Sequence, residues 1–356
     1  MSFRCGLVGM PNVGKSSIFN LLTNQKIPAE NYPFCTIDPN SAFVKVPDTR
    51  LDTLVNLNNS ENKVNAAIEF VDIAGLIKGA STGEGLGNDF LTHIMKTDVI
   101  AHVVRFFKDD DIIHVNGSTD PLSDFRDINL ELILADLSTT EKYLNSIKKS
   151  KKPLKNRNEL IQDLEKLIEH LSKEIFASKF KYTDNLAELT DLKLLTNKPM
   201  FVIANIDENN DSTNKFMIDN KLDLDLVAIN AALEQEIALL SEQEQKEFLS
   251  DLGLADTALE RIIKTGYKLL DLKTFFTSGP KESRAWSAKK TFNAIECSGI
   301  IHSDIKQGFI RAETVSYENY IKFDGEQGSK NNGVWRQEGK DYLVQEGDVI
   351  YFRFNI

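Results

Sequence analysis

The sequence predicts an α/β protein that is interrupted by a helical insertion and followed by a smaller β-rich part. A glycine-containing loop at residues 9–17 stands between a strand-like and a helix-like run, and further short apolar runs follow along the chain. Residues 121–196 instead repeat apolar side chains mainly at three-, four- and seven-residue steps. A buried-strand pattern returns at residues 199–205. The helical stretch is therefore predicted to be an insertion in the α/β part.

Composition and charge limit the classes of protein to consider. The 356 residues include 42 Lys and Arg against 53 Asp and Glu, a net charge of -11. This acidic balance argues against a protein that coats nucleic acid through its overall field, although a local basic patch stays open. No apolar run approaches the roughly 20 residues of a membrane span, and the chain begins with a strand rather than a signal peptide. Three cysteines without a Cys-x-x-Cys pair fit a reducing compartment and no structural zinc. We expect a cytoplasmic protein with no membrane contact.

The first elements are a strand at Phe3–Val8, a loop at Gly9–Ser17 and a helix that begins near Ser17. The loop fits Gly-x-x-x-x-Gly-Lys-Ser, the phosphate-binding loop (P-loop). In this arrangement the free backbone N–H groups and the helix N-terminus face a phosphate. An accidental glycine-rich turn is disfavoured because the Lys-Ser pair, the strand and the helix are all in place. The sequence therefore predicts a P-loop NTPase domain.

Within this loop, Lys15 is expected to reach the β- and γ-phosphates and to act in catalysis. The Ser16 hydroxyl is expected to bind Mg²⁺. The other predicted nucleotide-binding residues of the loop are Asn12, Val13, Gly14 and Ser17.

Two later segments have the pattern of nucleotide-sensing switches. Residues 24–43 predict a loop that leads into a strand, and Thr36 on it is expected to bind Mg²⁺ and sense the γ-phosphate. The strand Ala67–Asp72 ends in Asp72, an expected Mg²⁺ partner through water. Gly75 can offer its N–H to the γ-phosphate. The glycine-rich residues 79–88 are predicted to be a mobile switch.

Leu76 stands where hydrolytic switch proteins often have a water-orienting Gln. A leucine cannot orient water by hydrogen bonding, so either catalysis is slow or another group supplies it. Among the nearby histidines, His102 is expected to be a hydrogen-bonded core residue of a strand at 99–104, and His93 a structural or surface residue of a helix. His114 follows a polar segment and is the candidate for a group that swings toward the γ-phosphate.

The insertion is predicted to contain two helices with narrow apolar seams, joined by the basic stretch Lys148–Arg157. This pattern is typical of an antiparallel coiled-coil hairpin. The basic stretch is either a solvated run of charge or a contact to RNA phosphates. The expected seams comprise Leu130, Ile133, Leu137, Leu144 and Ile147 on one helix and Leu160, Leu164, Leu167, Leu171 and Ile175 on the other.

The strand at 199–205 ends in Asn205–Glu208, where a guanine-reading Asn-Lys-x-Asp motif would stand. Ile206 replaces the Lys and Glu208 replaces the Asp, while Asp207 is one position out of register. The lost carboxylate would accept from guanine, whereas the adenine N1 is an acceptor and offers it no proton. The guanine pocket is therefore weakened without an obvious alternative.

The end of the chain predicts a small β-rich part. Short strands are expected at 309–315, 342–344 and 349–355, with a turn at Gly347-Asp348 before the last strand.

Taken together, these motifs resemble the YchF subfamily of Obg-like ATPases over nearly the whole chain. Asn205-x-x-Glu208 is that subfamily's own mark. The resemblance implies an Obg-type nucleotide domain over residues 1–120 and 197–276, a coiled-coil insertion over 121–196 and a β-grasp (TGS) domain over 277–356. Further matching segments are Asn31–Asn40, Gly83–Asn88, Thr274–Trp286, Gly299–Glu313 and Glu338–Asp348.

The resemblance also implies a preference for ATP over GTP, Mg²⁺-dependent hydrolysis and binding to ribosomes, either the 50S subunit or the 70S particle. RNA contact through the coiled coil and the TGS domain is a further implication. Asn205, Ile206 and Glu208 would belong to the nucleotide site, and His114 would position the attacking water. Asn12 sits where related NTPases place a K⁺ ligand, which suggests K⁺ dependence as a hypothesis.

Some residues depart from the family's pattern, and two rival functions stay open. Asn230 stands where the family often has a small residue such as Ser, and residues 287–293 and 295–298 are less typical of a TGS core. An Obg- or DRG-type GTPase is one rival, against which Ile206 and Glu208 argue. The other is a nucleotide-stabilised ribosome-binding scaffold with little hydrolysis, which Leu76 permits.

Overall fold

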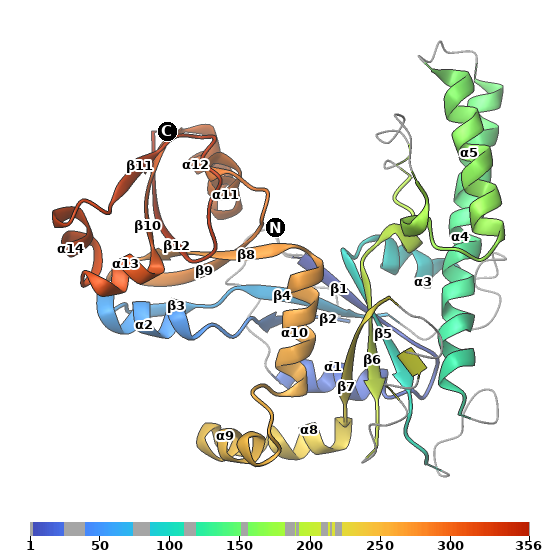
Figure 1. Cartoon of the computed structure of the whole chain (residues 1–356), viewed down its shortest axis with the longest axis horizontal. Helices are drawn as coiled ribbons and strands as arrows, with labels where there is room; N and C mark the ends of the chain where they lie inside the picture. Colours follow the sequence, from blue (N-terminus) through green and yellow to red (C-terminus); the bar gives the residue numbers. More distant parts are fainter. Residues whose placement is uncertain are drawn as a thin grey trace. The chain divides into compact units, whose positions relative to one another are not determined.

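A computed structural model describes residues 3–24, 40–73, 86–109, 119–150, 156–181, 189, 192–207, 213, 216–217 and 223–355. The chain divides into two compact units (Figure 1). Residues 4–22 and 70–262 form one, called here the P-loop unit, and residues 1–3, 23–69 and 263–356 form the C-terminal unit.

The P-loop unit is built on a mainly parallel sheet, which contains the predicted strands at 3–8, 67–72, 99–104 and 199–205. Strand β5 is buried along its whole length because it is central. Since the carboxyl ends of parallel strands meet at one edge, the loops that follow these strands converge there, as they do around ligands in open α/β sheets. Side by side lie β4 (Ala67–Asp72), β1 (Phe3–Val8), β5 (Val99–Arg105), β6 (Met200–Asn205) and β7 (Asp225–Ile229), and the pairs from β1 to β7 are parallel.

Helices connect these strands, and one of them corrects an expectation. Helix α3 begins at Leu86, so the last residues of the segment 79–88, predicted to be a mobile switch, are helical. Residues 79–85 lie outside the described part of the chain. The connecting helices are α1 (Lys15–Asn24), α3 (Leu86–Met95), α8 (Ala231–Ile237), α9 (Glu242–Asp251) and α10 (Ala258–Leu269), the last of which leads on to the C-terminal unit.

His102 lies on β5 and is fully buried, as expected. The expectation that it is hydrogen-bonded is wrong: neither ring nitrogen has a hydrogen-bond partner among the described residues. Its ring stacks on Phe125 with centroids 5.0 Å apart. Burial lowers its pKa from 6.5 to about 3, so the imidazole is neutral at ordinary pH.

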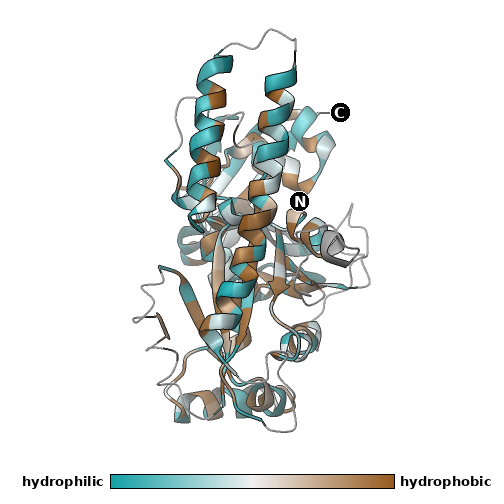
Figure 2. Ribbon diagram, turned by 90° about the vertical axis from the view of Figure 1, so that its right-hand side faces the viewer, coloured by the Kyte–Doolittle hydropathy of each residue, from teal (hydrophilic) through white to brown (hydrophobic). Residues whose placement is uncertain are grey.

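The two predicted long helices are present as α4 (Pro121–Lys149) and α5 (Arg157–Ser172). Asp120 caps α4 by accepting from the N–H groups of Leu122 and Ser123, each at 3.1 Å, with Pro121 in the first turn. The helices pack along each other, and Figure 2 shows hydrophobic bands on two long, otherwise mostly hydrophilic helices. The predicted seam residues buried between them include Ile133, Leu144, Ile147, Leu160, Leu164, Leu167 and Leu171.

Two residues expected in the seams do not lie there. Leu130 is 37% exposed and Ile175 is 40% exposed. Helix α5 ends at Ser172, so Ile175 is beyond the helix whose period it continues. Both side chains line a cavity at the foot of the hairpin.

The basic connector of the hairpin has internal partners at its two ends. The Lys148 ammonium lies 2.7 Å from a Glu165 carboxylate oxygen. Arg157 donates to the carbonyls of Ile147 (2.6 Å) and Lys148 (2.9 Å) in the last turn of α4, and the Ile147 carbonyl also accepts from the N–H of the capping residue Ser150 (3.3 Å). Both contacts favour a structural role for these two charges, while residues 151–155 lie outside the described part.

The foot of the hairpin is fixed by a buried carboxylate on α4. Asp136 is 1% exposed and accepts from the backbone N–H groups of Leu195 (2.7 Å) and Thr196 (2.8 Å) and from the Thr196 hydroxyl (2.6 Å). These three bonds attach α4 to the 3₁₀ turn η4 (Leu195–Asn197), which leads into β6. A second short 3₁₀ turn, η3 (Ala177–Lys179), follows α5.

The C-terminal unit has a six-stranded sheet with a contribution from early in the chain. Its strands lie in the order β11 (Arg336–Glu338), β10 (Phe309–Ser316), β12 (Asp348–Phe354), β8 (Leu272–Ser278), β9 (Glu282–Lys289) and β3 (Asn62–Val64). Strand β3 pairs parallel with β9. The same unit contains β2 (Ser41–Lys45) and the helices α2 (Thr49–Asn58), α11 (Ala294–Ile301), α12 (Ser303–Gln307), α13 (Tyr317–Lys322) and α14 (Gly325–Asn331).

The predicted strands of this unit are confirmed in two cases, β10 and β12. The strand expected at 342–344 is absent, since only an isolated bridge between Asn293 and Leu343 occurs there. Strand β8 begins at Leu272, so the sequence-based boundary at residue 276 falls inside a strand.

A buried lysine ties this unit together. Lys273, 2% exposed, donates its ammonium protons to the backbone carbonyls of Lys290 (3.1 Å), Phe292 (2.8 Å) and Val344. All three donors of the ammonium are used, so the residue acts as a structural link between β8 and two loops.

No helix in the described part of the chain is both long and apolar enough to span a bilayer. Cys5 and Cys297 are buried free thiols.

Candidate nucleotide-binding site

The predicted phosphate loop lies between β1 and α1 at the carboxyl edge of the sheet (Figure 1). Helix α1 begins at Lys15, and its first backbone bond runs from the Ile18 N–H to the Gly14 carbonyl at 3.0 Å. The N–H groups before Ile18 therefore have no partner inside the helix and point toward the loop. Ser16 is exposed and Ser17 half-buried at this helix end.

Two glycines of the loop are required by the surrounding structure. A side chain at Gly9 would collide with the Val103 carbonyl oxygen of β5. Gly14 has φ +91° and lies against the Asn205 carboxamide, so it needs both the left-handed conformation and the absence of a Cβ. Asn12 also adopts positive φ, at 63°, which asparagine tolerates better than most residues.

Lys15 and Asp72 meet at the mouth of the loop. The Lys15 ammonium forms an ion pair with an Asp72 carboxylate oxygen, and the lysine is only 8% exposed. The sequence analysis predicts that the lysine contacts phosphate and that the aspartate lies near Mg²⁺. In the structure these two charged groups contact each other beside the loop.

The donors near the loop fit a magnesium ion. The exposed Ser16 hydroxyl and the Asp72 carboxylate, whose side chain is 20% exposed, offer the hard oxygen atoms that Mg²⁺ prefers. Among the described residues no group of three His, Cys, Asp or Glu could hold a metal. A magnesium ion bound here would be held by these two side chains together with phosphate and water oxygens.

Asn205 braces the phosphate loop from the end of β6. Its Nδ2 donates to the Val13 carbonyl at 3.0 Å, and the residue is 4% exposed. The backbone carbonyl of Asn205 accepts from the N–H groups of Phe106 (2.8 Å) and Phe107 (3.2 Å). Asn205 thus joins the loop to the end of β5.

The base side of the site follows β6 and β7. The Ile206 N–H donates to the Ile229 carbonyl at 2.8 Å, and Ile206 is 9% exposed, while Asp207 is exposed. Asn230 caps α8, since its Oδ1 accepts from the N–H groups of Ala232 and Leu233, both at 3.1 Å. A serine at this position could also cap the helix, so the departure from the family's usual residue keeps the same local structure.

A cavity of about 940 Å³ connects the two sides of the site. It is large enough for a nucleotide, since pockets for drug-sized ligands span roughly 300–1,000 Å³. The lining residues are Met10, Pro11, Asn12, Gly14, Lys15, Ser16, Ser17, Phe107, Lys108, Asp109, Asn205, Ile206, Asp207, Asn230, Ala231, Ala232 and Gln235.

Sequence reasoning missed one wall of this cavity, formed by Phe107, Lys108 and Asp109 after β5. Arg105, 1% exposed, fixes this wall by donating to the carbonyls of Phe107 (3.2 Å) and Asp109 (3.0 Å). Its guanidinium lies 4.3 Å from the centre of the Phe107 ring. A charged residue at the end of an otherwise apolar strand was the available signal.

The structure brings together the predicted Asn12, Gly14, Lys15, Ser16, Ser17, Asn205 and Ile206 around one cavity, with Val13 buried in the loop and Asp72 on Lys15. Thr36, Gly75, Glu208 and His114 lie outside the described residues, as do Cys35 and Leu76. His93 is half-buried on α3.

Family models match both halves of the chain. A model described as a 50S ribosome-binding GTPase matches residues 4–134. The model for the C-terminal part of YchF GTPases, described as a protein of unknown function, matches residues 272–355.

Full-length relatives share close to half of their residues with this chain. Proteins named ribosome-binding ATPase YchF are 46% identical to it over 363 residues in Haemophilus ducreyi and over 366 residues in Bacillus subtilis, with 100% of both chains covered in each case. The solved structure of the Schizosaccharomyces pombe YchF GTPase superposes with a TM-score of 0.86 at 34% identity and covers 99% of this chain and 98% of that one.

Proposed function

The chain belongs to the YchF family, and on that premise we propose that it is a cytoplasmic, Mg²⁺-dependent ATPase switch that binds ribosomes. The observation that carries the proposal is the convergence of the Lys15–Asp72 pair and the Asn205-braced loop on one nucleotide-sized cavity. The names of the bacterial relatives support both the ATPase activity and the ribosome as partner.

In this proposal the residues of the chain divide the work of phosphoryl transfer. Lys15 leaves Asp72 to contact the β- and γ-phosphates, and the backbone N–H groups of residues 12–17 hold the phosphate oxygens. Mg²⁺, held by Ser16, by Thr36 and through water by Asp72, would neutralise the charge on the phosphates. Gly75 contacts the γ-phosphate, and His114 positions the attacking water in place of the Gln that Leu76 replaces. Slow intrinsic turnover is expected, because Leu76 offers no hydrogen bond.

Adenine selection is proposed for the base side. The carboxamide of Asn205 is committed to the Val13 carbonyl, and Ile206 presents an apolar side chain to the base. With Glu208 in place of the guanine-reading Asp, guanine would lack the short carboxylate that pairs with its N1–H and amino group. The rival Obg- or DRG-type GTPase needs that pairing, and the fission-yeast relative, which is named a GTPase, keeps the rival open.

Nucleotide titration and phosphate release test the activity. The purified protein is expected to bind ATP at least tenfold more tightly than GTP, a difference of about 1.4 kcal/mol, and to release phosphate from ATP only when Mg²⁺ is present. GTP binding as tight as ATP binding would reject the specificity. ATP binding with no phosphate release would favour the nucleotide-stabilised scaffold. Phosphate release measured in KCl and in NaCl tests the hypothesis that Asn12 binds K⁺. Equal rates in the two salts would reject it.

We also propose that residues 121–196 form a coiled-coil insertion and residues 277–356 a TGS domain within the nucleotide-domain framework of 1–120 and 197–276. Both would face the 50S subunit or the 70S ribosome and its RNA. The long paired helices and the separate C-terminal sheet support this division.

Sedimentation with ribosomes tests the partner. More protein is expected to pellet with ribosomes in the presence of a non-hydrolysable ATP analogue than with ADP or without nucleotide, because only a triphosphate would order Thr36 and Gly75. The Lys15→Met variant, which should not respond to the analogue, is the control. Equal pelleting in all three conditions would contradict the switch, and no pelleting in any of them would contradict the partner.

A further inference from the structure

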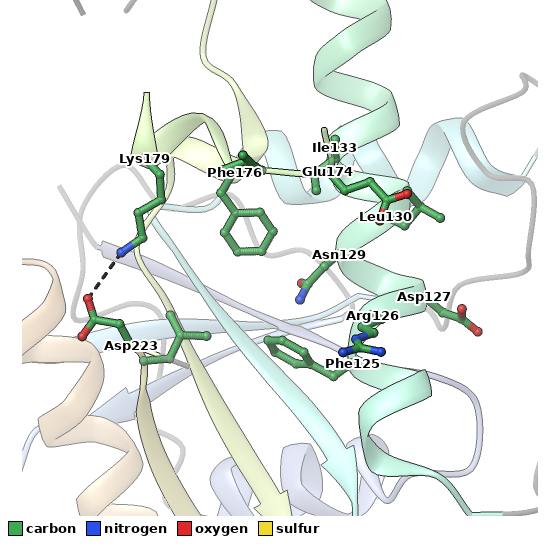
Figure 3. A pocket seen from close by; sticks show the side chains of 12 residues that line it. Phe125, Arg126, Asp127, Asn129, Leu130, Ile133, Glu174, Phe176, Lys179 and Asp223 are labelled. Carbon is green, nitrogen blue, oxygen red and sulfur yellow. Dashed lines mark hydrogen bonds and ion pairs between the residues drawn. The ribbon is translucent and has the colours of Figure 1, made fainter. Parts of the chain in front are cut away.

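A second cavity, of about 700 Å³, lies in the P-loop unit at the foot of the helical hairpin (Figure 3). Among the described residues, none lines both this cavity and the nucleotide cavity. Its walls come from α4, from the segment that follows α5 and includes η3, and from the residues before β7. The lining residues are Phe125, Arg126, Asp127, Asn129, Leu130, Ile133, Glu174, Ile175, Phe176, Lys179, Asp223 and Leu224.

Half of the lining residues are apolar, and some of these keep part of their surface in water. Leu130 and Ile175, the two residues that leave the predicted hairpin seams, line this cavity and are 37% and 40% exposed. Exposed apolar surface costs about 25 cal/mol per Å² relative to burial. A ligand that covered these side chains would recover this free energy.

Asn129 is the uncharged polar residue among those that line the cavity. Asn129, 7% exposed, lies one helical turn after Phe125 and one turn before Ile133, on the same face of α4. Its Oδ1 has no hydrogen-bond partner among the described residues. Figure 3 shows the amide nitrogen of this carboxamide pointing into the cavity between Phe125 and Phe176. The nitrogen can donate to a ligand in the cavity, whereas the buried oxygen would meet the ligand only if the carboxamide turned over.

The aromatic ring below Asn129 is fixed in place. Phe125 stacks on His102 with centroids 5.0 Å apart and an interplanar angle of 21°. It also meets Phe216 edge to face, at 5.8 Å and 89°. A flat ligand would therefore meet a ring that is already held in position.

The rim carries charges of both signs. Arg126 and Lys179 line it together with three carboxylates, those of Asp127, Glu174 and Asp223. The Lys179 ammonium lies 3.3 Å from the Asp223 carboxylate, as Figure 3 shows. This balance does not favour an anionic ligand.

We propose that this cavity is a binding site for an uncharged purine base or nucleoside. The Asn129 amide nitrogen, which points into the cavity, can donate to N7 of adenine, as asparagine does in base recognition. Phenylalanine rings are platforms on which such bases stack. The rim discriminates against phosphate, so the free nucleoside is favoured over a nucleotide or a base in an RNA strand. The site is independent of ATP hydrolysis at the P-loop.

Ligand-observed NMR with adenosine tests the proposal on the full chain, with excess ADP present to occupy the P-loop site. Adenosine is expected to bind with a Kd of about 1 mM or tighter, and AMP and a short oligoadenylate more weakly. Asn129→Leu is expected to weaken adenosine binding about tenfold, which corresponds to the loss of one or two hydrogen bonds. Asn145→Leu makes the same substitution at an exposed position of the same helix and should leave binding unchanged.

Several outcomes would overturn the assignment. These are no adenosine binding to the wild type, equal binding by the wild type and Asn129→Leu, or equal loss in both leucine variants. Tighter binding of AMP or oligoadenylate than of adenosine would reject the uncharged ligand class. Tighter binding of N-acetyl-tryptophanamide would reject the purine in favour of a peptide side chain. Since Asn129 assigns the signal to this cavity, the result does not depend on whether the P-loop site hydrolyses ATP.

Discussion

Lys15→Met is expected to reduce ATP turnover by about 10²-fold or more and to weaken ATP binding by roughly tenfold or more. The ammonium is buried at the mouth of the loop and pairs with Asp72, and in the proposed mechanism it moves from there to the β- and γ-phosphates. Methionine keeps much of the length and volume but removes the charge. Steady-state phosphate release and nucleotide titration measure the two effects. Retained turnover would remove Lys15 from the proposed mechanism.

His114→Ala provides the contrast to this variant. It is expected to lower turnover by about 10²-fold while leaving ATP affinity nearly unchanged, because a water-positioning group acts only in the reaction step. Unchanged turnover would exclude His114. Lys148→Met is a matched control for the lysine, since Lys148 also pairs with a carboxylate but lies on the hairpin. Its intrinsic ATPase activity should equal that of the wild type.

Local patterns predicted the parallel strands and the phosphate loop because those elements are defined by neighbours in the sequence. Gly9 and Gly14 mark a tight loop. The mostly apolar run Val99–Val104 predicts a strand without any knowledge of the strands that pair with it. The structure extends this strand by one residue, to Arg105. The same holds for α4 and α5, whose period is visible within each helix.

Pairings between distant residues could not be predicted in this way. The Lys15–Asp72 ion pair and the Asn205 brace on Val13 join residues that are 57 and 192 positions apart. The Arg105 contacts are local in the sequence, but they place a wall of the cavity only because the distant Asn205 also bonds the same segment. Strand β3 pairs with β9, and the paired residues Asn62 and Glu282 are 220 positions apart. The three residues of Asn62–Val64 contain no pattern that indicates this pairing.

Apolar periodicity also predicted more residues in the hairpin seam than the structure buries there. Leu130 and Ile175 fit the helical repeat, but the repeat does not say where a neighbouring element stops covering a helix. At the foot of the hairpin the partner helix has ended, and a cavity takes its place. Deviations from a regular pattern therefore marked the position of the second proposed site.

His102 differs from its expected role in a way that predicts acid sensitivity. Its folded-state pKa of about 3 lies below the ordinary 6.5 because the imidazole is fully buried. Between these values the unfolded chain takes up a proton that the folded chain does not. The folded state is therefore unaffected by this group above about pH 6.5 and loses stability as the pH falls below it, by about 1.4 kcal/mol per pH unit.

His102→Leu is expected to remove about 2–3 kcal/mol of the stability loss that the wild type shows between about pH 7 and pH 4.5. Leucine cannot be protonated and needs no hydrogen bonds, so at neutral pH it should cost little beyond the stacking on Phe125. Urea unfolding followed by circular dichroism at both pH values measures the difference. His93→Leu, at a half-buried position on α3, controls for the loss of a histidine and should keep the acid sensitivity of the wild type. If His102→Leu and the wild type lost equal stability on acidification, the buried neutral imidazole would not be the cause of the acid sensitivity. The folded protein would then have to accommodate the protonated imidazole through a hydrogen-bond partner.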